Sequence, residues 1–162
     1  MIAGVLRVKN EERFLARCLR SLDFCEAIYL LDDGSTDRTP EIARNFRNVE
    51  YTSSPWNTLD EVRDRTFLLD IARAAGAEWV VCLDGDEELT PEAAARIQRC
   101  DYDGLELRVY YLWDGEEQVR TDGVYGRFYA KRAFHLDPQA KLEYPRLNTS
   151  GFHCGSVPKG IA

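Results

Sequence analysis

Acidic residues follow two apolar segments of this sequence, at the point where each segment ends. Residues 27–31 (AIYLL) run into Asp32 and Asp33, and residues 78–83 (EWVVCL) run into residues 84–86 (DGD). If both segments are parallel strands of one sheet, their carboxyl ends lie at the same edge, where such sheets bind ligands. Four carboxylates at one edge repel each other unless a cation or hydrogen-bond donors lie among them. We therefore expect a polar ligand site at this edge.

The second acidic turn has the composition of a site for a hard divalent cation. Asp84 and Asp86 flank a single glycine, and Mg²⁺ or Mn²⁺ takes carboxylate oxygens together with water and substrate phosphate. Gly85 allows an unusual backbone angle and the close approach of a ligand. Asp and Gly are also common in ordinary exposed turns. Two such turns after two core strands favour a cation that carries a phosphate-bearing substrate.

The elements around these turns alternate between strand and helix patterns. This alternation is typical of a parallel α/β sheet. We expect Ser35 or Thr36 to cap the second helix, Thr90 to cap the fourth, and Gly76 to end the third. The expected strands are 2–8, 27–31, 48–52 and 78–83, and the expected helices are 11–22, 37–46, 59–75 and a last one that starts at Pro91.

The pattern changes after Cys100. Residues 104–113 and 124–130 are predicted to be longer strands, joined by an acidic loop and forming an antiparallel extension, while residues 131–138 (KRAFHLDP) are predicted to form a surface turn. The aromatic residues of this part are expected mostly in the core and on sheet faces, although some would suit a platform for a sugar acceptor. They are Tyr110, Tyr111, Trp113, Tyr125, Phe128 and Tyr129.

Composition limits the class of protein. A chain of 162 residues has room for one domain with a real core, and no apolar run approaches the ~20 residues of a membrane span. The net charge of −7 disfavours nucleic acid as a partner. Five cysteines without a CxxC pair argue against a disulfide framework and a zinc site. The early charges at the N-terminus argue against a signal peptide, so we expect a cytoplasmic protein and leave association with the cytoplasmic face of a membrane open.

Three motifs together resemble a known family. They are VKNEERFLARCLRSL, LLDDGSTDRTPEIA, and Arg65 followed by GAEWVVCLDGDEELTP. Over residues 2–100 their order and spacing resemble the N-terminal half of family 2 glycosyltransferases with the GT-A fold. The resemblance implies one domain over residues 1–162: an open, twisted, mainly parallel sheet with helices on both faces and an antiparallel C-terminal extension. Residues 1–100 would bind a nucleotide sugar and residues 101–162 would face the acceptor.

The resemblance also implies a reaction. A nucleotide-diphosphate sugar would donate its sugar, with inversion, to a hydroxyl of a glycan, lipid or protein acceptor. A bound Mn²⁺ or Mg²⁺ would make the diphosphate a better leaving group by taking up developing charge. The resemblance implies that the base is bordered by Val8, Asn10 and Glu11, and that Asp32 and Asp33 contact the base or ribose. It places Arg65 near the nucleotide. Asp84 would contact the ribose or the metal's water shell, and Asp86 would ligate the metal.

Such a reaction needs a base that deprotonates the acceptor hydroxyl. Asp122 is the first candidate, with Glu143 and Asp114 behind it, although each also fits an ordinary loop acid. His153 is a further candidate metal ligand, although histidine is also common in loops.

Three alternatives stay open at this point. A phosphatase of the haloacid dehalogenase type also places an Asp-x-Asp motif after an apolar strand, but normally has Thr or Val where this chain has Glu88. A nucleotidyltransferase would carry a basic Gly-rich loop after the first strand, where this chain has VKNEE. A nucleotide-sugar-binding module without catalysis would lack a base and an acceptor surface in residues 101–162.

Overall fold

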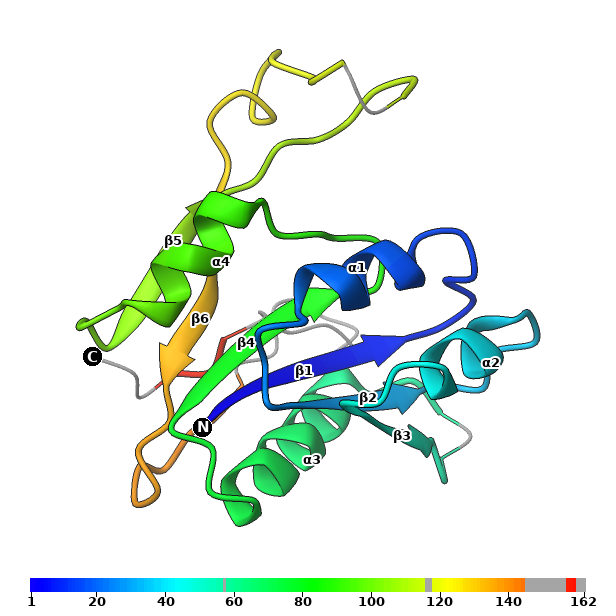
Figure 1. The fold of residues 1–162 in the computed structure, drawn as a ribbon, viewed down its shortest axis with the longest axis vertical. Coiled ribbons are helices and arrows are strands. Elements are labelled where there is room, and N and C mark those ends of the chain that lie inside the picture. Colours follow the sequence, from blue (N-terminus) through cyan, green and yellow to red (C-terminus); the bar gives the residue numbers. More distant parts are fainter. Residues whose placement is uncertain (57, 116–117, 145–156, 160–162) are drawn as a thin grey trace.

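A computed structural model describes residues 1–56, 58–115, 118–144 and 157–159 (Figure 1). The described residues form one six-stranded sheet with helices on both faces. In chain order the elements are β1 (Ile2–Val8), α1 (Leu15–Ser21), β2 (Ala27–Asp32), α2 (Thr39–Arg44), β3 (Val49–Ser53), α3 (Glu61–Ala74), β4 (Trp79–Asp84), α4 (Pro91–Gln98), β5 (Gly104–Arg108) and β6 (Tyr129–His135).

The strand order confirms the predicted mainly parallel sheet with an antiparallel extension. The order is β3-β2-β1-β4-β6-β5. β1 lies between β2 and β4 and is parallel to both, and β3 is parallel to β2. β6 pairs with β4 in the antiparallel sense, and β5 pairs with β6. The carboxyl ends of β2, β1 and β4 therefore lie next to one another, as the ligand site requires.

Two apolar layers hold the sheet between its helices. On one face, Leu15 and Leu19 of α1 and Leu22 just after it pack in one apolar cluster with residues of β1 and β2, as the helical spacing of these residues predicts. On the other face, Leu68 and Leu69 of α3 belong to a second cluster of buried apolar side chains. The central strands are apolar on both sides because both of their faces are covered.

The C-terminal part differs from its prediction. β5 ends at Arg108 rather than at residue 113, and β6 covers Tyr129–His135 instead of 124–130. The predicted surface turn at 131–138 is therefore mostly strand, because Ala133 and Phe134 pair with the exposed edge of β4 and are buried there. Burial of these two residues outweighs the turn-like composition around them.

Residues 109–115 and 118–128, which we call the arm, leave the sheet between β5 and β6 and project from it (Figure 1). Asp114, Gly115 and Gly123 adopt positive φ angles, which extended strands do not accommodate. The prediction that the aromatic residues here belong mostly to the core is wrong: Trp113 is 59% exposed and Tyr110 is 51% exposed.

Helix ends follow the sequence at two of the three predicted positions. Gly76 has a φ of +80° just after α3, and the Thr90 hydroxyl accepts a hydrogen bond from the Ala93 N–H at the start of α4. The predicted cap of α2 is wrong. α2 begins only at Thr39, with Arg38 as its N-cap residue and no capping side chain among the described residues, while Ser35 and Thr36 lie before this start and bond to Asp32 and Asn10.

The described cysteines agree with the predicted absence of a disulfide framework. Cys18, Cys25, Cys82 and Cys100 are free thiols, and Cys154 lies outside the described residues. Of the helices that the structure describes, none is long and apolar enough to cross a membrane.

The cap at Thr90 gives a stability prediction. Thr90→Ala removes the acceptor for the Ala93 N–H and should lower the free energy of unfolding by about 1 kcal/mol. Thr90→Ser keeps a hydroxyl in place and should stay close to the wild type. Urea denaturation followed by circular dichroism measures both; equal midpoints for the two variants would show that the cap contributes nothing.

Candidate functional site

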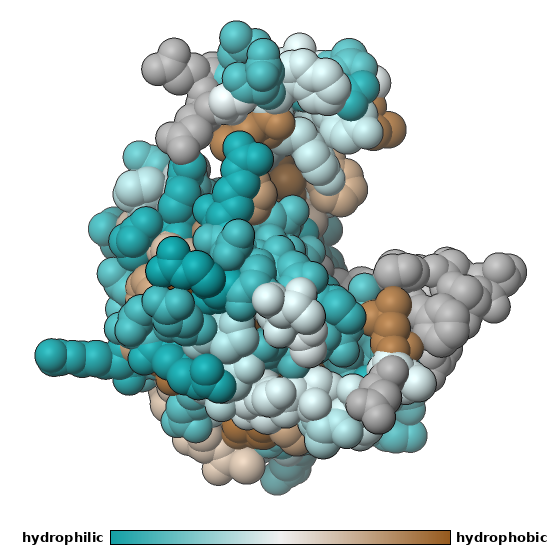
Figure 2. Space-filling model, turned by 90° about the vertical axis from the view of Figure 1, so that its right-hand side faces the viewer, coloured by the Kyte–Doolittle hydropathy of each residue, from teal (hydrophilic) through white to brown (hydrophobic). Residues whose placement is uncertain are grey.

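The sheet register brings the two acidic turns to either side of the end of β1. Val8 is opposite Asp32 of β2, and Arg7 is opposite Asp84 of β4. The arrowheads of β1 and β2 point to the same side in Figure 1, and Figure 2 views the molecule from that side. The acids predicted from two distant parts of the sequence thus share one edge.

Asp32 stabilises the turn after β2. Its side chain is 1% exposed. Oδ1 accepts hydrogen bonds from the N–H and the hydroxyl of Ser35, at 2.9 and 2.6 Å. Oδ2 accepts a hydrogen bond from the hydroxyl of Tyr51 on β3, at 2.7 Å. Both oxygens are therefore occupied within the protein, which suits a carboxylate that shapes the turn more than one that contacts a base or ribose.

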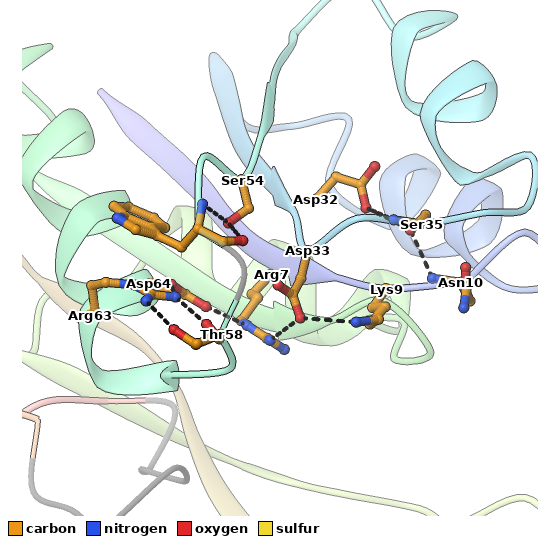
Figure 3. A network of polar contacts seen from close by, with 11 residues as sticks. Arg7, Lys9, Asn10, Asp32, Asp33, Ser35, Ser54, Thr58, Arg63 and Asp64 are labelled. Carbon is orange, nitrogen blue, oxygen red and sulfur yellow. Dashed lines mark hydrogen bonds and ion pairs between the residues drawn. The ribbon is translucent and has the colours of Figure 1, made fainter.

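Asp33 is held on one side only. Its Oδ2 accepts a hydrogen bond from Arg7 Nη2 at 2.7 Å, and Lys9 Nζ lies 3.5 Å from the same oxygen (Figure 3). Among the described residues no hydrogen bond reaches Oδ1 of Asp33. The side chain is 9% exposed. A carboxylate that is fixed through one oxygen can offer the other to an N–H or hydroxyl of a ligand.

Arg7 is itself fixed by a buried carboxylate from α3. Its Nε donates to Oδ2 of Asp64 at 2.9 Å, and Asp64 is fully buried. The other oxygen of Asp64 accepts two hydrogen bonds from Arg63, at 2.9 and 2.7 Å. Arg63 also lies over the ring of Trp56, 4.2 Å from its centroid, and so connects the loop before α3 to this network (Figure 3).

The site residues predicted from the sequence did not include Arg7, Lys9, Arg63 and Asp64. One signal was available: an arginine inside the apolar segment of residues 2–8 needs a partner, because a buried charge is costly without one. The sequence does not identify that partner, since Asp64 lies 57 residues further along the chain.

Asp84 is held from two directions. Its Oδ1 accepts a hydrogen bond from Arg65 Nη2 at 2.9 Å, and its Oδ2 lies 3.9 Å from Arg132 Nη2. Burial lowers the pKa of Arg65, but the Asp84 carboxylate outweighs this and keeps the pKa above the usual arginine value. Arg65 therefore stays charged beside the turn, and its implied place near a nucleotide stays a prediction.

Gly85 matters for space rather than for its backbone angle. It does not adopt the positive φ angle that we considered for it. A Cβ atom at this position would lie 2.7 Å from Cγ of Glu11 and 3.1 Å from Cγ1 of Val8. The missing side chain lets the turn after β4 approach the end of β1.

The other residues predicted at the end of β1 contribute mainly to its shape. Val8 is 2% exposed, and its carbonyl accepts a hydrogen bond from the Asp33 N–H. Asn10 has a φ of +56°, and its side-chain oxygen accepts a hydrogen bond from the Thr36 N–H at 2.8 Å. These contacts place the predicted base-binding segment beside the turn that carries Asp33.

Asp86 differs from the other acids of the edge. It is exposed, and its carboxylate makes no hydrogen bond or ion pair within the described residues. Burial raises the pKa of Glu11, and the negative charges of Asp86, Asp37 and Asp84 raise it further. Negative charge thus exceeds positive charge locally at this part of the edge.

A divalent cation fits this part of the edge through Asp86, with Asp84 as its neighbour. In the part of the chain that the structure describes, no three His, Cys, Asp or Glu residues converge as a ready metal centre. A Mg²⁺ ion that takes one or two protein carboxylates and substrate phosphates does not need three. His153, the further candidate ligand, lies outside the described residues.

The three candidate bases lie in the C-terminal part. Asp122, in the arm, forms a two-pronged ion pair with Arg120 at 2.6 and 3.0 Å, and hydrogen bonding to Arg120 holds the pKa of Asp122 below its usual value. Lys141 similarly lowers the pKa of Glu143. Asp114 is exposed in the arm.

Comparison with known proteins agrees with this geometry. Residues 5–99, more than half of the chain, match the model of glycosyl transferase family 2. The chain belongs to this family. The N-terminal segment that carries both acidic turns lies within the match, as the resemblance implied.

A solved structure that is similar to this chain shows the same fold. TarS of S. aureus, residues 1–349, is 25% identical with a TM-score of 0.52, over 64% of this chain and 34% of that chain. TarS has also been solved in complex with UDP and with UDP-GlcNAc. The likeness confirms the predicted α/β fold of the GT-A type.

The curated relatives are longer proteins. A TPR repeat-containing protein of Synechococcus elongatus is 38% identical over 85% of this chain and 32% of its own length. The lipopolysaccharide core biosynthesis glycosyltransferase LpsC of Rhizobium meliloti is 29% identical over 49% of this chain and 29% of its own length. The chain thus spans about a third of the length of these relatives.

The contact between Tyr51 and Asp32 gives a prediction that depends on pH. Burial and the hydrogen bond to Asp32 raise the pKa of Tyr51 above 10.0. Tyr51→Phe leaves one oxygen of Asp32 without its donor and should lower the free energy of unfolding at pH 7 by about 1–3 kcal/mol. Because the folded-state pKa is raised, the contribution is complete below pH 10 and disappears as the pH rises through the folded-state value.

Urea denaturation of both proteins from pH 7 upward measures this difference. Tyr29→Phe is the matched control, because Tyr29 is also buried on the sheet but its hydroxyl makes no hydrogen bond within the described residues. A difference between wild type and Tyr51→Phe that stays constant to high pH would contradict the assigned role of the hydroxyl.

Proposed function

We propose that this domain binds a uridine diphosphate sugar at the carboxyl edge of β2, β1 and β4 and transfers the sugar to an acceptor hydroxyl. One observation carries the proposal: the end of β1 is flanked by Asp33 and Asp86, and among the described residues no donor reaches one oxygen of Asp33 and no partner reaches Asp86. Membership of family 2 and the UDP and UDP-GlcNAc complexes of TarS support it.

Asp33 is the proposed contact to the base or ribose. Arg7 and Lys9 neutralise and orient its carboxylate through Oδ2, so that Oδ1 can accept a hydrogen bond. Uracil offers an N–H at its pairing edge, and a fixed acceptor discriminates strongly in favour of a ligand that supplies such a donor. Guanine and thymine also carry ring N–H groups, so the size of the pocket must complete the selection of the base.

Asp86 and Asp84 are the proposed holders of Mn²⁺ or Mg²⁺. The ion, when bound, takes up the negative charge that develops on the diphosphate as the sugar bond breaks. Arg65 keeps Asp84 oriented and adds positive charge near the same turn. Glu11 lies against Gly85 and narrows the space beside the turn.

The arm is the proposed acceptor side. Apolar side chains gather on the arm at the top of Figure 2, on the face that also presents the carboxyl edge. Tyr111 and Tyr125 pack edge to face with their ring centroids 4.9 Å apart, and Arg120 lies over the ring of Tyr125. Exposed aromatic groups mixed with charged ones mark binding surfaces, and ring faces with nearby donors suit a sugar.

Asp122 is the proposed base, with one condition. A carboxylate with a lowered pKa is a weak base, so Arg120 must release Asp122 when the acceptor binds. Inversion at the sugar carbon, which the family resemblance implied, is part of the same proposal. A base that deprotonates the acceptor hydroxyl would direct its attack onto the face of the sugar carbon opposite the departing diphosphate.

A binding module without catalysis is the second candidate function. The observation in its favour is that Asp122 and Glu143, two of the three acids considered as bases, are paired with Arg120 and Lys141. Family membership and the TarS-like fold favour either of these functions over a phosphatase or a nucleotidyltransferase.

Metal-dependent nucleotide binding tests the donor site. Titration calorimetry with UDP, GDP and dTDP, each with and without Mn²⁺, should show UDP binding that is strengthened by the metal. Asp86→Asn should weaken binding of UDP in the presence of Mn²⁺ by about 10-fold or more and leave the weaker metal-free binding unchanged. Asp70→Asn, an exposed acid on α3, is the matched control. If Asp86→Asn binds UDP with Mn²⁺ as the wild type does, Asp86 is not a metal ligand.

Removing the proposed base separates transfer from binding. Asp122→Asn should keep the affinity for UDP and lower the rate of sugar transfer by roughly 10²- to 10⁴-fold. Release of UDP from UDP-GlcNAc, measured with acceptors selected on a glycan array, reports the rate. Undiminished transfer by Asp122→Asn would eliminate Asp122, and a wild type that binds UDP but transfers to nothing would favour the binding module.

A further inference from the structure

We propose that Arg132 is a positioning residue for the donor site: it holds Glu87, and through Glu87 it fixes the turn that presents Asp86. This inference rests on the proposed function, because it concerns the same acidic turn. It assigns part of the donor site to β6, in the half of the chain that the family resemblance assigned to the acceptor.

The antiparallel pairing of β6 with β4 places Arg132 next to the turn. Val81 of β4 is opposite Ala133 of β6. Because the two strands run in opposite directions, the residue before Ala133 lies further toward the carboxyl end of β4. Arg132 occupies this position and is 9% exposed. Its long side chain is therefore enclosed while its guanidinium reaches the end of β4.

The guanidinium of Arg132 forms an ion pair with Oε1 of Glu87. The same Nη2 atom lies 3.9 Å from Oδ2 of Asp84. Arg132 thus lies close to both Asp84 and Glu87, the two acids on either side of Gly85 and Asp86. A buried guanidinium that donates a charge-assisted hydrogen bond fixes a carboxylate in position as well as neutralising it.

Glu87 closes the turn from its other end. Its Oε2 accepts a hydrogen bond from the backbone N–H of Asp84 at 3.1 Å. Its own backbone N–H donates to the carbonyl of Asp84 at 3.0 Å. The carboxylate of Glu87 therefore joins Arg132 on one side to the backbone of Asp84 on the other. Losing the cation would release the side chain that fastens the turn.

The charges of the turn support this division of roles. Arg65 and Arg132 together offset the negative charges of Asp84 and Glu87. Asp86 has no partner within the described residues and keeps its charge for a ligand. A Glu87 side chain without Arg132 would add a second uncompensated carboxylate beside Asp86. Arg132 therefore controls both the shape of the turn and the number of free acids on it.

The test compares variants of both partners in the complete chain. UDP affinity is measured by calorimetry with and without Mn²⁺ for the wild type, Arg132→Gln, Glu87→Gln and the double variant. The electron paramagnetic resonance signal of bound Mn²⁺ in the presence of UDP reports the environment of the ion. Circular dichroism verifies the fold. Lys131→Gln, an exposed cation on the same strand, is the matched control.

We expect Arg132→Gln and Glu87→Gln each to weaken Mn²⁺-dependent UDP binding by about 10-fold, which is typical when a residue that orients a metal ligand is lost. The double variant should be no weaker than the weaker single variant, because the two side chains act as one unit. Arg132→Lys keeps the charge without the guanidinium and should recover part of the affinity. UDP binding without Mn²⁺ and the Lys131→Gln control should match the wild type.

The outcomes separate this inference from the proposed function. A wild type that binds no UDP with Mn²⁺ overturns the proposed function and this inference with it. Wild-type binding that is unaffected in a folded Arg132→Gln overturns only the inference. A loss in Arg132→Gln without a loss in Glu87→Gln would mean that Arg132 acts through Asp84 or on the ligand itself rather than through Glu87, which also overturns it. If Arg132→Gln does not fold, unchanged binding by Glu87→Gln overturns the inference in its place.

Discussion

This structure depends on one constraint: the carboxylates at one edge of the sheet need cations or hydrogen-bond donors beside them. Parallel strands bring their carboxyl ends together, and in this chain those ends carry Asp32, Asp33 and Asp84. An uncompensated buried charge costs several kcal/mol. The fold meets this cost with donors from three neighbouring elements: Tyr51 from β3, Arg7 from β1 and Arg65 from α3.

The acids differ in how many of their carboxylate oxygens accept hydrogen bonds from the protein. This difference separates acids that stabilise the edge from acids that can bind a ligand. Asp32 is bonded through both oxygens, and Asp64 is fully buried between Arg7 and Arg63. Asp33 is bonded through one oxygen, and Asp86 through none in the described residues. A ligand gains most from the acids that the protein leaves incomplete, because no internal hydrogen bond must be broken to reach them. The pairing pattern thus identifies Asp33 and Asp86 as the acids of this edge that a ligand could reach, which is the basis of the proposed donor site.

The sequence predicts this edge well and the pairing within it poorly. The apolar strands and the acids after them are local patterns, so both acidic turns and the four parallel strands could be placed from residues 2–86 alone. The partners of the acids are remote in sequence: Arg7 meets Asp33 across 26 residues and Asp64 across 57. Many arginines of this chain would satisfy a rule that an acid needs a cation. Only the strand order determines which of these arginines lie next to the acids of the edge.

The error in the C-terminal part has a related cause. The aromatic residues of the arm have a strand-like composition, whereas β6 contains Lys131, Arg132 and His135, which resemble a surface segment. β6 is a strand because β4 leaves an edge that must be paired, and Ala133 and Phe134 fill it. The arm has no such neighbour in the sheet. Composition predicts how well a segment would fit a sheet, but the unpaired edge decides which segment is used.

This arrangement lets the two parts of the C-terminal half vary to different extents. The arm leaves the sheet between β5 and β6, so its aromatic side chains can change without moving the strands that carry the acidic edge. β6 has no such freedom, because it completes the sheet beside β4 and carries the guanidinium that faces Asp84 and Glu87. Different side chains on the arm are therefore compatible with the same geometry of the edge. Under the proposed function, the donor and acceptor sides would meet at the base of the arm.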